Sequence, residues 1–304
     1  AAAPAQESAA RGPRRKPHWK DPLLRWPTGR VVVNDARLCL EAHADPLALS
    51  AELLRLAVAA QAGPESAVEE LTARSAALKC ALLTGLGPQD LWCFWVNVFH
   101  LLLVHAMLVV GRPRGVQRVV EFFNRCSYLV AGHAFSLVEI EHCILRRNMS
   151  KPRLAFAWAV LKTWPRSDAD LEERPCLHAP PCPASAFSCR PDWRLNLVLS
   201  AGNCGSSDAL PVFEATDEAS FDAAVQRAVD RTLLCCGSVG GDVVELPYNL
   251  SRYRGDLPGG CDREGSERRW AELLAPGSQA GAAAVYRKEY SWSMRERLEL
   301  LAGA

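Results

Sequence analysis

Residues 91–110 read LWCFWVNVFHLLLVHAMLVV, twenty consecutive positions without Asp, Glu, Lys or Arg. Three polar side chains nevertheless lie inside this run, namely Asn97, His100 and His105. A segment this apolar must be removed from water on nearly every side, and a buried polar atom costs free energy unless it finds a hydrogen-bond partner. The sequence therefore predicts a central buried helix whose few polar side chains bond to other parts of the chain.

A second stretch, residues 136–146, reads SLVEIEHCILR and supplies candidate partners. Ser136 followed three residues later by Glu139 forms a capping box, which predicts a helix from Leu137 to about Arg147. We expect this helix to bond to the buried helix and to fix the two in register. The expected structural polar network consists of Asn97, His100, His105, Glu141, His142 and Arg146.

Apolar spacing and turn residues predict the remaining elements. Helices are expected over residues 47–61, 66–83, 116–123 and 154–164, from Thr216 to about Leu234, and around Trp270 and Leu298. Strands are expected over residues 30–33, 195–199 and 243–246, with a hairpin over residues 128–135. These elements predict an α+β fold, a mainly helical single domain with a central buried helix and a small β-sheet.

The domain organisation follows from shifts in composition. Residues 1–24 are basic among Ala and Pro and are expected to form a disordered arm. Residues 25–304 are expected to form one α+β domain, interrupted at residues 165–191 by a loop insertion rich in Pro, Ser, Ala and Cys. Of the 304 residues 49% are hydrophobic, which is enough for a large packed core.

Charge and cysteine content narrow the possible functions. The chain holds 35 basic and 34 acidic residues, so its net charge of +1 does not favour nucleic acid as a partner. Many of the twelve cysteines lie among apolar residues, which favours a reducing compartment and a soluble cytoplasmic protein, with organelle import left open. Residues 91–110 are long enough to span a bilayer, but an Asn and two His would be costly there, so no membrane insertion is expected.

Several motifs carry a family resemblance. They are the run from Phe94 to His100 with a further His105, the hairpin from Tyr128 to Gly132, the helix from Ser136 to Arg146, and the late segment from Tyr290 to Ser293. In these motifs the chain, from about Val31 to Met294, resembles the domain of unknown function 547 family. His100 departs from the family pattern, which usually has Asn there. Members attach this module to coiled-coil or glutaredoxin-like domains, so the resemblance implies an interaction module.

A catalytic alternative rests on a single cysteine. Cys204 lies in a polar Gly/Ser loop after an apolar segment, which is a position typical of a nucleophile. Attack by its thiolate requires His105 or His142 within hydrogen-bond reach, with Glu141 to orient or deprotonate the imidazole. Backbone amides of the loop would then stabilise the oxyanion. These residues predict a cysteine/histidine-dependent hydrolase or transferase as the alternative function. His100, His105, His142 and Glu141 also have the chemistry of zinc ligands.

A second metal hypothesis falls in the insertion. Cys176, His178, Cys182 and Cys189 are four zinc-type ligands within fourteen residues. Because their spacing matches no standard zinc motif, a disordered loop is the default expectation, and a structural zinc is the hypothesis set against it. No other cofactor is expected.

Three functions from different classes remain open. The favoured one is a protein-interaction or scaffold module whose partner is another protein, because no complete catalytic set is visible and the charge is balanced. The alternative is the hydrolase or transferase with its pocket at Cys204, His105, Glu141 and His142. A redox role for the thiols is the weakest, because no Cys-x-x-Cys is present.

Overall fold

The computed structural model describes residues 29–35, 45–147, 149, 188–214, 217–240, 243–256, 269–272, 283–286 and 293–302. The basic arm, the helix expected over residues 154–164 and the insertion up to residue 187 lie outside the described residues. So does Thr216, the expected start of a helix.

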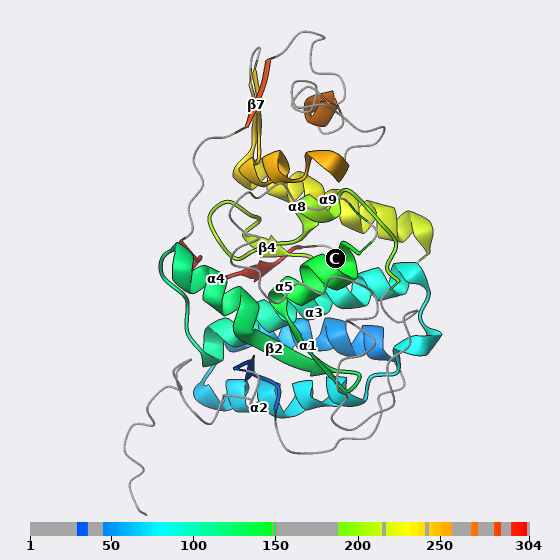
Figure 1. The fold of residues 1–304 in the computed structure, drawn as a ribbon, viewed down its shortest axis with the longest axis vertical. Helices are drawn as coiled ribbons and strands as arrows, with labels where there is room; N and C mark the ends of the chain where they lie inside the picture. The colour runs from blue at the N-terminus through cyan, green and yellow to red at the C-terminus, as the bar shows by residue number, and fades with distance from the viewer. Residues whose placement is uncertain are drawn as a thin grey trace, which may run out of the picture.

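Helix α3 (Pro88–Val109) runs through the middle of the protein (Figure 1). It begins with Pro88, which a helix tolerates in its first turn, and it is followed by Gly111 at a φ of 92°. Every residue from Leu91 to Ala106 is buried. Within the described part of the chain α3 is the one helix long and apolar enough to cross a membrane, and 89% of its most apolar window is buried inside the protein. The central buried helix is therefore confirmed.

Helices that precede α3 in the chain cover one side of it. Helix α1 (Pro46–Ala60) packs along α3 and is capped by Asp45, whose Oδ1 accepts a hydrogen bond of 3.0 Å from the Ala48 amide. Helix α2 (Glu65–Ser75) follows, and the chain then tightens into the 3-10 turns η2 (Ala76–Cys80) and η3 (Leu83–Gly85). The long helix expected over residues 66–83 thus ends early, at Ser75.

A three-stranded sheet lies beside these helices. Strand β1 (Val31–Val32) pairs in parallel with β2 (Cys126–Val130), which pairs antiparallel with β3 (His133–Ser136). The expected hairpin is confirmed, and its turn places Ala131 and Gly132 at positive φ. Helix α4 (Val116–Arg125) connects α3 to this sheet.

The motif at residues 136–146 forms an irregular helix. Ser136 caps α5 (Leu137–Glu139) through the predicted capping box, and the chain continues as the π-helix η4 (Ile140–Leu145). The Arg146 amide donates to the Glu141 carbonyl five residues earlier, at 2.9 Å, whereas an α-helix would use the carbonyl four residues earlier. The start of this helix was predicted correctly and its winding was not.

The second half of the described chain adds helix and short strands. The strand expected over residues 195–199 is instead α8 (Leu195–Val198), because a short apolar run fits a buried helix as well as a strand. Helix α9 (Glu218–Cys236) is capped by Asp217. The helix expected around Leu298 is wrong, since β8 (Glu299–Leu300) pairs there with β4 (Ala209–Leu210).

A third sheet consists of β5 (Ser238–Gly240), β6 (Val243–Leu246) and β7 (Ala283–Tyr286), and lies at the end of the molecule opposite α2 (Figure 1). The turns η6 (Tyr248–Arg252) and η7 (Arg254–Asp256) follow β6. The described elements form a mainly helical α+β fold with a central helix, as predicted.

Candidate functional site

Asn97, in the middle of α3, is fully buried and hydrogen-bonds to the backbone of a distant segment. Its Oδ1 accepts from the Phe213 amide at 3.0 Å and its Nδ2 donates to the Phe213 carbonyl at 2.7 Å. The second Nδ2 proton is donated to Ser50 Oγ on α1, at 3.1 Å. One side chain therefore joins α1, α3 and the segment after β4.

His105 lies between two hydroxyl groups, and their bonds fix its tautomer. Thr72 Oγ1 donates to the Val68 carbonyl at 2.8 Å, so its contact of 3.0 Å with His105 Nε2 requires Nε2 to carry the proton. His105 Nδ1 therefore accepts from Tyr128 Oη, at 2.7 Å. Burial lowers the pKa of His105 to about 3, so the imidazole is neutral near pH 7.

His100 is neutral for the same reason, since burial lowers its pKa to about 3. Its Nε2 accepts a hydrogen bond of 3.0 Å from the Ser200 amide, which places the ring proton on Nδ1. No residue described in the structure accepts that proton.

The predicted pairing of these side chains with Glu141, His142 and Arg146 is wrong for Asn97 and His105. Every polar atom of Asn97 and His105 bonds to α1, α2, β2 or the segment after β4. The helices α3 and η4 do pack against each other, but they do so through apolar side chains. The expected network is therefore divided between two separate sites.

The second site is built around Arg146, whose side chain is only 2% exposed. Its Nη2 bonds to Asp256 Oδ2 at 2.6 Å, its Nη1 donates to Asn196 Oδ1, and its Cζ lies 3.9 Å from the ring centroid of Tyr253. Asn196 Nδ2 also donates to Asp256 Oδ2, at 2.8 Å. A buried ion pair with these additional bonds connects η4 to α8, η6 and η7.

Glu141 and His142 complete this second site. Tyr253 Oη donates to Glu141 Oε1 at 2.7 Å, and His142 Nε2 lies 3.7 Å from the same oxygen. Burial raises the pKa of Tyr253 well above its usual value, which keeps the phenol protonated as a donor. Burial also lowers the pKa of His142, and the Glu141 carboxylate offsets part of that shift.

Glu139, one turn earlier, has a structural role. Its carboxylate accepts two hydrogen bonds from the Arg30 guanidinium, at 2.5 and 2.7 Å, and one from the Ser136 amide at 2.8 Å. The Glu139 side chain is only 1% exposed, so Arg30 neutralises a buried charge and ties β1 to the start of α5.

Cys204 is the one exposed thiol among the described cysteines. Its amide donates to the Ser293 carbonyl at 3.3 Å, and the Asn203 side chain accepts from the Gly205 amide at 3.0 Å, so the loop is held internally. His105 has both ring nitrogens occupied by Thr72 and Tyr128, and neither is available to a thiol. Of the predicted catalytic residues, Glu141 and His142 lie close together, with Glu141 Oε1 and His142 Nε2 3.7 Å apart.

The structure describes one of the four residues in the zinc hypothesis. Cys189 is buried, and burial raises the pKa of its thiol, whereas Cys176, His178 and Cys182 lie outside the described residues. Over the residues that the structure describes, no group of three or more His, Cys, Asp or Glu is arranged to hold a metal ion. The site at residues 176–189 stays a prediction.

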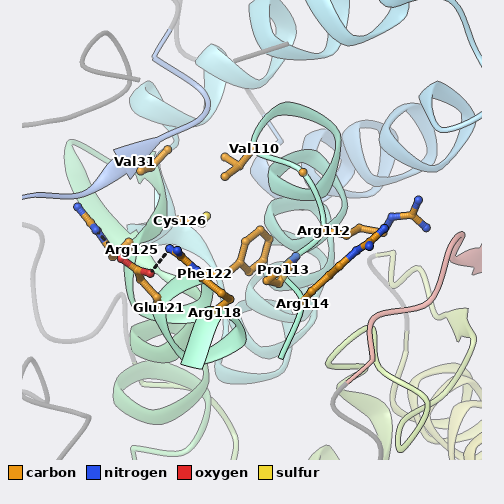
Figure 2. A pocket seen from close by; sticks show the side chains of 11 residues that line it. Val31, Val110, Arg112, Pro113, Arg114, Arg118, Glu121, Phe122, Arg125 and Cys126 are labelled. Carbon is orange, nitrogen blue, oxygen red and sulfur yellow. Dashed lines mark hydrogen bonds and ion pairs between the residues drawn. The ribbon is translucent and has the colours of Figure 1, made fainter. Parts of the chain in front are cut away.

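Sequence reasoning missed a pocket where α3 ends and α4 begins. The cavity has a volume of about 560 Å³, and we call its buried lining residues Val31, Val110 and Phe122 the apolar floor. In Figure 2, Arg118 and Arg125 appear on one side of Phe122, and Arg112 and Arg114 on the other. We call this cavity the arginine pocket; it is lined by Val31, Val110, Gly111, Arg112, Pro113, Arg114, Arg118, Glu121, Phe122, Arg125 and Cys126. The available signal was the repeated Arg at residues 112, 114, 118 and 125, which resembles an ordinary solvated surface when viewed alone.

The arginines of this pocket fall into two pairs. Arg118 and Arg125 both bond to Glu121, at 3.2 and 2.9 Å, and Arg125 Nε also donates to the Gly29 carbonyl at 2.8 Å. Arg112 and Arg114 are exposed, and no residue in the described ranges forms an ion pair or side-chain hydrogen bond with them. The pocket therefore combines a buried apolar floor with two uncompensated positive charges.

Comparison with known proteins shows a similarity to one protein family over part of the chain. The sequence profile of a family described as a protein of unknown function, DUF547, matches residues 83–220, which include α3, the hairpin, η4 and α8. No curated protein matches the chain, and no solved structure matches it. The chain is therefore similar to the DUF547 family over residues 83–220, which make up less than half of its 304 residues.

Proposed function

We propose that this chain is a protein-interaction module and that the arginine pocket is where it holds its partner. The single observation that carries the proposal is the pair of uncompensated guanidinium groups, Arg112 and Arg114, beside the apolar floor at Phe122. A cavity of about 560 Å³ is of the size that binding sites use, and such sites combine apolar walls with a few charged groups.

The use of the other polar groups also supports binding over catalysis. Asn97 and His105 bond fully to neighbouring elements, and Arg146 forms a buried ion pair with Asp256. Groups used in this way stabilise the fold and are not available to a substrate. In contrast, Arg112 and Arg114 of the pocket are exposed to solvent.

The test compares three forms of the full chain: wild type, the double variant R112E/R114E, and the control R227E/R297E. Arg227 and Arg297 are exposed arginines outside the pocket, so the control carries the same change in net charge. Calorimetry on purified components measures the binding of a partner protein to each form. We expect a partner that binds wild type and control at 1:1 stoichiometry to bind R112E/R114E with lower affinity. Equal affinity for all three forms would contradict the assignment.

A second candidate is acid–base catalysis by Glu141 and His142, and one observation favours it. Both lie on the π-helix η4, and π-helices are frequent at functional sites. The Tyr253 hydroxyl donates a hydrogen bond to Glu141 Oε1, and His142 Nε2 lies 3.7 Å from the same oxygen. A donor, a carboxylate and an imidazole thus lie close together. If this candidate holds, Glu141→Gln abolishes turnover of a substrate while the melting temperature changes little, and R112E/R114E retains that turnover.

A further inference from the structure

We infer that the arginine pocket binds an acidic peptide segment that carries one apolar anchor residue, an inference that rests on the proposed interaction function. Four arginines and one glutamate line the pocket, so four positive charges less one negative charge leave a formal charge of +3. Complementarity of charge therefore selects an anionic ligand.

The distribution of that charge points to carboxylates. Glu121 already neutralises Arg118 and Arg125 through its two oxygens, which leaves Arg112 and Arg114 for the ligand. A guanidinium group binds a carboxylate through paired N–H donors. Two such groups match two acidic side chains, whereas the Glu121 carboxylate would repel a multiply charged phosphate placed among all four arginines.

The apolar floor requires more of the ligand than charge. Val31, Val110 and Phe122 are buried residues that line the cavity, and Pro113 lines it as well (Figure 2). An inorganic anion would leave this surface in contact with water, but a leucine or aromatic side chain would cover it. The floor and the rim together thus fit an apolar residue flanked by Asp or Glu.

Arg112 and Arg114 lie in a turn that is flanked by two glycines. Arg112-Pro113-Arg114 lies between Gly111 at a φ of 92° and Gly115 at a φ of 81°, conformations that other residues rarely adopt. Pro113 fixes its own φ as well. The two exposed arginines therefore project from a turn whose backbone conformation depends on the two glycines.

The charge of residues 1–28 does not match the ligand inferred for the pocket. Residues 1–28 join the described chain at Gly29, whose carbonyl already bonds to Arg125 at the rim of the pocket. Those residues contain six Lys or Arg and two Asp or Glu. Their charge has the same sign as that of the pocket, and we assign the acidic segment to a partner protein.

Fluorescence anisotropy with the full chain tests this inference. The probe is a labelled short peptide with Phe at its centre and Asp or Glu on both sides, and two matched peptides replace the acids by Asn and Gln or the Phe by Ala. We expect each replacement to weaken binding by about tenfold or more. R112E/R114E should lose binding of the acidic peptide, R227E/R297E should keep it, and added salt should weaken it.

Other outcomes separate the inference from the function on which it rests. If the neutral peptide binds as tightly as the acidic one, and a benzophenone at its centre cross-links to residues 110–126, the charge inference is overturned while pocket-mediated protein binding survives. If no peptide binds, or if anionic phosphoinositide vesicles alone bind, both fail. Matching melting curves for the three proteins show that lost binding is not lost folding.

Discussion

Replacement of Asn97 by leucine tests how the core of this protein is held together. Leucine has a similar shape and keeps α3 apolar, but it can neither donate nor accept. Asn97→Leu therefore leaves the amide and the carbonyl of Phe213 without the bonds of 3.0 and 2.7 Å that they now make. Phe213 is only 2% exposed, so water cannot replace the lost partner.

The magnitude follows from these two backbone groups. A buried donor or acceptor left unsatisfied costs about 1–3 kcal/mol, and two of them cost about 2–6 kcal/mol. Leucine recovers part of this loss through its additional apolar burial, so we expect Asn97→Leu to lower the free energy of unfolding by about 3 kcal/mol. That is a large fraction of the 5–15 kcal/mol typical of a folded domain.

Urea denaturation followed by circular dichroism measures this change. Ser50→Ala is the matched control, because it removes only the 3.1 Å bond to Asn97 and the internal bond of Ser50 to the Leu47 carbonyl. We expect the control to cost about 1 kcal/mol and the double variant to cost less than the sum of the two. A loss below about 1 kcal/mol for Asn97→Leu would refute the view that this side chain holds the Phe213 segment against α3.

Three further predictions concern other buried groups. The pKa of His105 falls from about 6.5 in the unfolded chain to about 3 in the folded protein, so the unfolded state binds more protons between these pH values. The contribution of the neutral His105 to the free energy of unfolding is therefore fully present above about pH 6.5 and is lost as the pH falls toward 3. The stability lost between about pH 7.5 and about pH 5.5 should be smaller by about 1.4 kcal/mol in His105→Gln than in wild type, and an equal loss in both would speak against a neutral buried imidazole. Arg30→Ala should destabilise the protein by about 3–5 kcal/mol in urea, because it leaves the Glu139 carboxylate buried without its cation, and Arg30→Ala/Glu139→Gln should recover part of that loss. Tyr253→Phe removes the 2.7 Å bond to Glu141 and keeps the aromatic ring, so a melting experiment should register about 1–2 kcal/mol, and no change would mean that water replaces the hydroxyl.

Much of the fold was predictable because local chemistry decides it. Twenty positions without a charge require a buried helix, and the α3 that results is buried from Leu91 to Ala106. The capping box at Ser136 and the hairpin turn at Gly132 are likewise set by residues next to one another in the chain. Residues 195–199, in contrast, form a short apolar run, and whether such a run is helix or strand depends on its tertiary contacts.

The partners of the buried polar residues were not predictable. Asn97 bonds to the backbone of Phe213, and a backbone amide or carbonyl is the same chemical group at every position, so the sequence holds no signal for it. The sequence predicts an α-helix at residues 137–147, whereas the observed π-helix places Arg146 differently from a regular α-helix. In that position Arg146 contacts Tyr253 and Asp256. The arginine pocket was missed because its wall includes Val31, which lies far from α4 in the sequence.

The order of α1 and α3 along the chain has a consequence for biosynthesis. Helix α3 is as apolar as a membrane span, so a nascent chain that exposed it alone would attract lipid or other unfolded chains. Helix α1 packs along α3 and leaves the ribosome before it. Helix α1 is therefore synthesised before the apolar surface of α3 that it covers. A circular permutant that begins at α3 should aggregate during translation even where its native contacts are unchanged.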